Sequence, residues 1–166
     1  MNPIHWLAKQ FDQETKTTRR HLERLPGDKL NWRPHEKSST AGALASHLVE
    51  CIRWTNDILT RNEIDIDFAT YKPYEASSTS ELLEAFEKAV AEGKQVLAGV
   101  DEEAAMQPWS LKANGQTLFA RPRVDVLRDF TLSHLIHHRG QFSVYLRLLN
   151  VPVPGSYGPS ADEPWH

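Results

Sequence analysis

The chain has 166 residues, of which 40% are hydrophobic and 25% charged, a composition typical of one compact domain over residues 1–166. Its formal net charge is −3 and it contains no long run of like charges, so we expect no nucleic-acid partner. The chain lacks the roughly 18 uninterrupted apolar residues of a membrane span and begins without a signal-peptide pattern. We therefore expect a cytoplasmic protein that does not contact membranes.

The first 60 residues predict two long helices joined by an irregular loop. Apolar residues recur at intervals of three and four over residues 3–25, and the Pro26-Gly27 pair then interrupts the pattern. After a loop rich in helix-breaking residues, the same spacing returns over residues 40–60, where Thr40 offers a capping hydroxyl.

The middle of the chain predicts a third helix and a small hairpin. Residues 61–77 are polar and lose the helical spacing, so we expect a loop there. A capping-box sequence then opens a helix over residues 78–99. In the segment 109–119, the dipeptide Asn114-Gly115 tolerates the positive φ angles of a tight type I′ turn and predicts a short hairpin.

A fourth helix is expected over residues 122–149, followed by a tail rich in proline and glycine that lies over the surface. The face of this helix that we expect to point inward carries Leu127, Phe130, His134, His138, Gln141, Tyr145 and Leu148. Four amphipathic helices must bury their apolar faces against one another, so the sequence predicts an all-α four-helix bundle with a hairpin between its third and fourth helices.

Three of the eight histidines lie on inward faces of these helices: His47 on the second, and His134 and His138 on the fourth. A spacing of four residues places two side chains on one face, about 5.4 Å apart along the helix. One buried histidine commonly forms a hydrogen bond to a carbonyl or carboxylate. Three buried histidines without a shared partner would leave several polar atoms without hydrogen bonds. We therefore predict that these three residues bind one divalent metal ion.

Four neighbouring side chains are candidates for further roles at this site. Cys51 lies one turn after His47 and offers a thiolate ligand, although a small buried cysteine of no chemical role is the commoner case. Glu50 offers a base or a partner for a ligand, or else occupies a solvated helix position. Gln141 and Tyr145 offer hydrogen bonds to substrate or water, or else are polar residues near the end of the bundle core.

The remaining histidines receive no metal role. His137 lies about 100° around the helix from His138 and should point to another face, at the surface or as a partner of a ligand. His5 lies near the N-terminus, and His21 is expected at an outward-facing helix position. His35 lies in a loop, and His166 is the last residue.

The segment HLIHHRGQ at residues 134–141 resembles the DinB/YfiT-like superfamily of small metal-binding helical bundles, and residues 32–48 and 151–162 fit the same superfamily. This resemblance covers nearly the whole chain. It implies a bundle with a crossed order of helices and a divalent metal ion held by histidines at the positions of His47, His134 and His138. Zinc or nickel is expected first, and iron or manganese after them.

The resemblance also implies structural roles for two residues next to the histidines. Arg139 would pair with an acidic residue, and Gly140 would let two helices approach closely. Members of this superfamily often form homodimers, so a homodimer is a further expectation.

For function, the resemblance implies a thiol transferase that uses a low-molecular-weight thiol such as bacillithiol, mycothiol or glutathione. A metal-dependent hydrolase and a non-catalytic protein that binds metal or a small ligand are the alternatives. Three neutral imidazoles leave a divalent ion with an open position, where a thiol or water becomes a nucleophile at neutral pH. Candidates for binding the carboxylates of such a thiol are Arg33, Arg53, Arg139 and Arg147.

Overall fold

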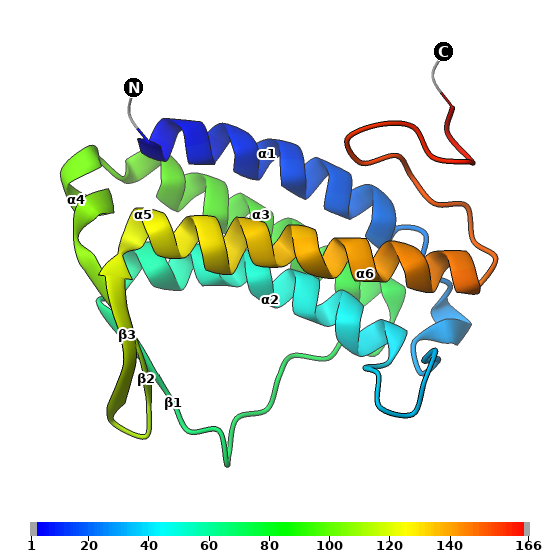
Figure 1. Ribbon diagram of the computed structural model, residues 1–166, viewed down its shortest axis with the longest axis horizontal. Helices are drawn as coiled ribbons and strands as arrows, with labels where there is room; N and C mark the ends of the chain where they lie inside the picture. Colours follow the sequence, from blue (N-terminus) through cyan, green and yellow to red (C-terminus); the bar gives the residue numbers. More distant parts are fainter. Residues whose placement is uncertain (1–2, 165–166) are drawn as a thin grey trace.

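The computed structural model describes residues 3–164 and consists of long helices beside a small sheet (Figure 1). The long helices are α1 (Pro3–Leu22), α2 (Ala41–Thr60), α3 (Thr79–Gly99) and α6 (His134–Leu148). The last of these continues directly from α5 (Arg123–Val126) and a π-helical segment (Leu127–Ser133), and α4 (Glu102–Met106) and a 3₁₀ turn (Gly27–Lys29) are short. The prediction of four long helices is confirmed, whereas α4 was not predicted.

The helices do not pack in chain order. α1 and α2 each pack against both α3 and α6, so the consecutive helices α1 and α2 lie diagonally across the bundle. In Figure 1, α2 and α3 run in one direction and α1 and α6 in the other, because the connection over residues 61–78 carries the chain back along the bundle after α2. The crossed order implied by the resemblance is confirmed.

Local signals determine where the helices begin and end. The hydroxyls of Thr40 and Ser78 accept backbone hydrogen bonds in the first turns of α2 and α3, as expected of N-caps. α1 ends at Leu22 rather than at Leu25, because hydrogen bonds between residues three apart tighten the chain into a turn before Pro26.

The three-stranded sheet has the order β1-β2-β3, with β1 parallel to β2 and β2 antiparallel to β3. Asn114 (φ 50°) and Gly115 (φ 79°) form the turn of the predicted hairpin. The strands are β1 (Glu63–Ile66), β2 (Pro108–Ala113) and β3 (Gln116–Pro122). β1 corrects the expectation of an irregular loop over residues 61–77. Its alternation covers only four residues, and its pairing with a strand more than forty residues away is a tertiary contact.

Two glycines show where the helices approach closely and where they do not. A Cβ atom added to Gly93 of α3 would lie 2.6 Å from Cζ of Phe11, so α1 and α3 meet there. A Cβ atom added to Gly140 would have no neighbour within 4 Å. The expectation that Gly140 allows a close helix contact is therefore wrong, because this residue lies on the exposed side of α6.

The last helix turns a different face to the core than the one expected from the sequence. Its buried residues in α6 are Leu135, Arg139, Phe142 and Leu146, each one position after an expected one. Of the expected residues, only Leu127 is buried, and Gln141 and Leu148 are exposed. The half-buried ones are Phe130, His134, His138 and Tyr145. The π-helical turns contain more residues than α-helical turns and shift the phase of everything that follows. The histidines therefore border the core instead of filling it.

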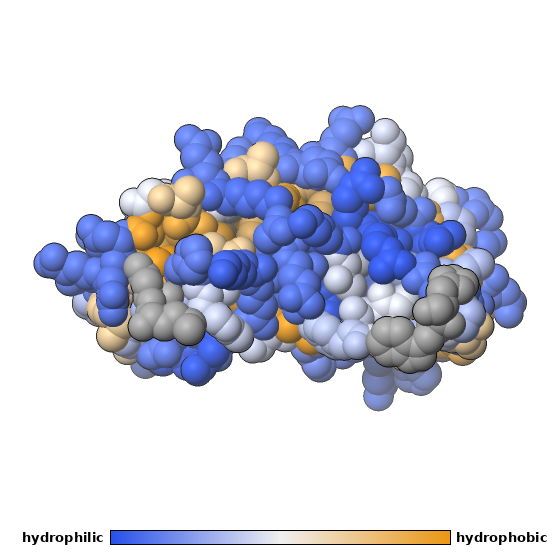
Figure 2. Space-filling view, turned by 90° about the horizontal axis from the view of Figure 1, so that it is seen from above, coloured by the Kyte–Doolittle hydropathy of each residue, from blue (hydrophilic) through white to orange (hydrophobic). Residues whose placement is uncertain are grey.

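The face that carries α1 and the C-terminal tail is mainly hydrophilic, and apolar side chains gather toward the end where the chain begins (Figure 2). Among residues 3–164, no helix combines the length and the apolar character that crossing a membrane requires.

Candidate metal centre

Imidazoles from α2 and α6 converge at one point of the bundle. The Nε2 atom of His47 lies 3.3 Å from Nε2 of His134, which lies 2.7 Å from Nε2 of His138. His134 and His138 occupy successive turns of α6, and His47 faces them from the neighbouring helix α2. The structure thus brings together the three histidines that the sequence singles out.

The second ring nitrogen of two of these histidines is engaged by the protein. The Nδ1–H group of His47 donates to Oε2 of Glu50 at 2.9 Å, and that of His138 donates to Oε1 of Gln141 at 2.7 Å. Because an ionised carboxylate can only accept, neutral His47 carries its proton on Nδ1 and has a lone pair on Nε2. Such partners fix the tautomer and orientation of histidines that bind metal ions.

The surroundings favour neutral imidazoles. Burial, followed by the neighbouring His138 and His47, lowers the pKa of His134 to about 4. Burial also lowers the pKa of His138, although its hydrogen bond to Gln141 acts in the opposite direction. Both rings are therefore unprotonated at neutral pH, which is the state that binds cations.

Glu50 is 8% exposed, which excludes the solvated position considered for it. While Oε2 accepts from His47, Oε1 accepts from the hydroxyl of Tyr71 at 3.0 Å and from the backbone N–H of Tyr74 at 2.8 Å. Burial by itself would raise the pKa of Glu50, but these hydrogen bonds outweigh it and lower the pKa. Both carboxylate oxygens are thus engaged, and Glu50 acts as a partner of His47 instead of a free base.

Cys51 is 1% exposed and lies behind His47 on α2. Ligand atoms of Cys51, His47 and His134 all lie within 4.8 Å of one another, so these three residues could hold a metal ion. Burial, and then the charge of Glu50, raises the pKa of the thiol to about 12. Without a cation beside it, the thiol stays protonated.

A cavity of about 540 Å³ opens onto His47 and His138. Its other lining residues are Ser38, Ser39, Ala43, Leu44, Gln141, Val144 and Tyr145. None of these lining residues is Asp, Glu, Lys or Arg, so the four arginines considered from the sequence do not line it. Gln141 and Tyr145 lie at the cavity, where they can meet a bound molecule, whereas no signal in the sequence predicts the two serines there.

Aromatic side chains adjoin His134. The ring of Phe130 meets His134 edge to face, with centroids 6.4 Å apart, and also contacts Trp54 and Phe119. Trp109 of β2 completes this aromatic cluster and is fully buried. The hairpin inserted before α5 therefore supplies part of an apolar wall beside the histidines, a role that only its packing reveals.

Arg139, the residue after His138, connects α6 to α1 and to the C-terminal tail. Its guanidinium donates to the carboxylate of Glu14 at 2.7 Å, to the hydroxyl of Thr18 at 3.3 Å and to the hydroxyl of Tyr157 at 2.9 Å. Glu14 is the acidic partner that the resemblance implied for Arg139.

The histidines without an expected metal role differ in their surroundings. His137 is exposed, as expected, with its ring against His138, and His5 and His35 are exposed as well. The outward position expected for His21 is wrong, because its side chain is 0% exposed. α1 contacts the C-terminal tail in addition to α3 and α6, so more of its circumference is covered than its apolar pattern indicates. His166 lies outside the described residues.

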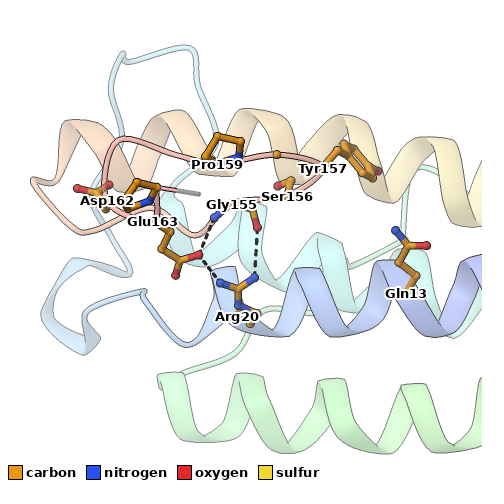
Figure 3. Close-up of a pocket in the computed structure, with 10 residues that line it drawn as sticks. Gln13, Arg20, Gly155, Ser156, Tyr157, Pro159, Asp162 and Glu163 are labelled. Carbon is orange, nitrogen blue, oxygen red and sulfur yellow. Dashed lines mark hydrogen bonds and ion pairs between the residues drawn. The ribbon is translucent and has the colours of Figure 1, made fainter. Parts of the chain in front are cut away.

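A second cavity of about 680 Å³ lies between α1 and the C-terminal tail (Figure 3). The carboxylate of Glu163 accepts from the guanidinium of Arg20 and from the backbone N–H of Gly155, and Arg20 also donates to the carbonyl of Gly155. These groups satisfy one another and anchor the tail, so the histidine centre, and not this cavity, is the candidate functional site.

Comparisons with known proteins agree with this architecture. The chain matches the model of the DinB family over residues 1–165. It is 28% identical to an uncharacterized protein of Bacillus subtilis strain 168, YrdA, over 161 residues that cover 96% of this chain and 90% of YrdA.

Two crystal structures are similar in fold. One is a DinB-like protein of Bacillus cereus ATCC 10987, with a TM-score of 0.72, 20% identity and coverage of 95% of this chain and 100% of that protein. The other is a DinB-like protein of Bacillus subtilis, YjoA, with a TM-score of 0.70, 16% identity and coverage of 96% and 99%.

Proposed function

The chain belongs to the DinB family, and from this premise we propose that it is a metal-dependent enzyme whose single divalent cation is held by His47, His134 and His138. Zinc and nickel are the first candidates for the cation, since imidazole nitrogen suits both. The proposed reaction is the transfer of a low-molecular-weight thiol to an electrophile, carried out in the cytoplasm.

The observation that carries this proposal is the close approach of the Nε2 atoms of three histidines, with the rings of His47 and His138 held through Nδ1. Two nitrogens bound to one tetrahedral zinc ion at about 2.0 to 2.1 Å lie roughly 3.3 Å from each other. The separation of 3.3 Å between His47 and His134 equals that value. The 2.7 Å contact between Nε2 of His134 and Nε2 of His138 is a hydrogen-bonding distance, so these two rings also contact each other directly.

The side chains around the three histidines have distinct roles in this proposal. A divalent cation bound here would lower the pKa of a thiol or water and so supply a nucleophile at neutral pH. Glu50 and Gln141 hold His47 and His138 through Nδ1. The aromatic cluster of Phe130, Trp54, Phe119 and Trp109 limits access of water on the side of His134.

The cavity beside His47 and His138 suits an uncharged molecule. Besides the imidazoles of His47 and His138, its polar side chains are hydroxyls and an amide, and its volume of about 540 Å³ is in the range of small-molecule sites. We assign it to the electrophile, because nothing among its lining residues would pair with the carboxylates of a thiol such as glutathione. The thiol would approach from outside this cavity.

Metal analysis of two neighbouring single variants tests the proposal. We expect about one zinc or nickel ion per chain in the wild-type protein and in His137→Ala, whose side chain is exposed, and loss of the ion in His138→Ala. The wild-type protein should conjugate a thiol to a model electrophile, and the metal-depleted protein should not. Equal metal content in the two variants would contradict the proposed ligand set.

Cys51 favours a second candidate function, a non-catalytic metal-binding protein, because a thiolate ligand would close the coordination shell. The Co²⁺-substituted protein distinguishes the two. A strong sulfur-to-cobalt charge-transfer band that disappears in Cys51→Ser would support the closed site, and its absence would support the open, catalytic one. A metal-dependent hydrolase, the remaining alternative, would act in the absence of any added thiol.

A further inference from the structure

We propose that residues 67–77, here called the strap, are coupled to the metal centre through Glu50, and that Tyr71 is the positioning residue of this coupling. The inference rests on the proposed function, because it assumes that His47 binds a cation. It adds that the connection between β1 and α3 strengthens cation binding when it is seated on α2.

Glu50 links two parts of the molecule through one carboxylate group. Oε2 accepts from Nδ1 of His47 at 2.9 Å, and Oε1 accepts from the Tyr71 hydroxyl at 3.0 Å and the Tyr74 N–H at 2.8 Å. The two oxygens belong to one rigid planar group, so a change in the hydrogen-bond donors on one oxygen changes the orientation of the other. Seating of the strap therefore affects the orientation of the imidazole of His47.

The strap has few other attachments. Of residues 67–77, Ala76 is buried, Tyr74 is half-buried and the rest are exposed. Besides Glu50, the strap contacts α2 through a hydrogen bond from the N–H of Ala76 to the Ser46 hydroxyl and through the ring of Tyr74, which lies 4.3 Å from the guanidinium of Arg53. A segment that buries so little apolar surface opens locally at low free-energy cost. The hydrogen bonds to Glu50 are therefore a large part of what holds it.

The coupling must act in both directions. A cation on Nε2 draws electron density from the ring and makes Nδ1–H a stronger donor, which fixes Glu50 in the orientation that the strap binds. By thermodynamic reciprocity, a seated strap raises the affinity for the cation by the same factor by which the cation favours seating.

Two tyrosine variants test the role of Tyr71. Tyr71→Phe removes a hydroxyl that donates to Glu50. Tyr74→Phe removes a buried hydroxyl without a hydrogen-bond partner among the described residues and leaves the backbone N–H contact in place. In competition titrations with Zn²⁺ alone, we expect Tyr71→Phe to bind about fivefold or more weakly than wild type and Tyr74→Phe to stay within about twofold. Equal affinities of the two variants would overturn the inference.

Amide hydrogen exchange at Tyr74 gives a readout that a general loss of stability would not imitate. We expect Zn²⁺ to slow exchange of this amide about fivefold or more in the wild-type protein. The slowing should be much smaller in Tyr71→Phe, while amides at the centre of α3 respond equally in both. Failure of the wild-type protein to bind either Zn²⁺ or Ni²⁺ would overturn the proposed function together with this inference. Normal Zn²⁺ binding with unchanged exchange at Tyr74 would overturn this inference alone.

Discussion

Arg139 and Glu14 form an ion pair whose side chains are 2% and 3% exposed. The hydroxyl of Tyr157 contacts both partners, so α6, α1 and the C-terminal tail meet at one buried carboxylate. Because Arg139 directly follows His138, this pair restricts rotation of α6 about its axis and helps to aim the histidines. A buried pair is costly to break, since removing one partner leaves the other charge without compensation.

Replacement of Arg139 should therefore destabilise the protein strongly. We expect Arg139→Met to lower the free energy of unfolding by about 3 to 5 kcal/mol, measured by urea denaturation. The matched control is Arg147→Met, which breaks a largely exposed pair with Asp162 and should cost less than about 1 kcal/mol. Similar losses in the two variants would argue against a buried charge network.

His21 should make stability depend on pH. Burial, against a smaller opposite effect of its hydrogen bond to the carbonyl of Thr17, lowers its pKa in the folded protein below the ordinary 6.5. Below pH 6.5 the unfolded chain therefore binds a proton that the folded chain does not, and stability falls as the pH falls. Urea denaturation at pH 5 and 7.5 should show a smaller loss on acidification for His21→Leu than for wild type. An equal loss would mean that His21 does not contribute.

At the scale of elements, the π-helical segment Leu127–Ser133 determines which residues of the last helix are available for chemistry. It shifts the helical phase so that Leu135 and Phe142 enter the core while His134 and His138 stay at its border. The border position leaves the imidazole of His138 on the wall of the cavity, with His134 one turn away. Departures from α-helical geometry of this kind are frequent at functional sites.

Two glycine-to-alanine changes should have opposite effects on the stability of the helices that carry them. Gly140→Ala adds a Cβ into open space and should raise the free energy of unfolding by about 0.5 to 1 kcal/mol through better helix propensity. Gly93→Ala places its Cβ against the ring of Phe11, which is 2% exposed. This change should lower the free energy of unfolding by about 1 to 2 kcal/mol. Thermal unfolding of both variants checks this, and a stabilised Gly93→Ala would show that the contact between α1 and α3 yields easily.

At the scale of the whole molecule, the proposed cation joins α2 to α6 and should stabilise the fold. At a free Zn²⁺ concentration 100 times its Kd, we expect the free energy of unfolding to rise by about 2.7 kcal/mol if the unfolded chain does not bind the ion. Thermal unfolding with and without a chelator measures this gain. His134→Ala should show no gain, whereas a gain that persists in this variant would place the ion elsewhere.

The homodimer stays a prediction that sedimentation can test.

The amino-acid sequence by itself determined the four long helices, the Asn114-Gly115 turn and the placement of His134 and His138 on one side of the last helix. All depend on local signals: a spacing of three and four residues, capping hydroxyls, and a dipeptide that accepts positive φ. The resemblance added the crossed helix order and the acidic partner of Arg139. Neither follows from spacing alone, because both depend on which helices become neighbours.

Only the tertiary structure decided what surrounds the histidines. β1 exists because it pairs with β2, and Glu50 is buried because residues 67–77 supply donors to its carboxylate. His21 is buried because α1 is covered on more sides than its own pattern indicates. Each of these outcomes depends on contacts between segments distant in the sequence, whereas periodicity reports only how a helix divides its own surface between water and the interior.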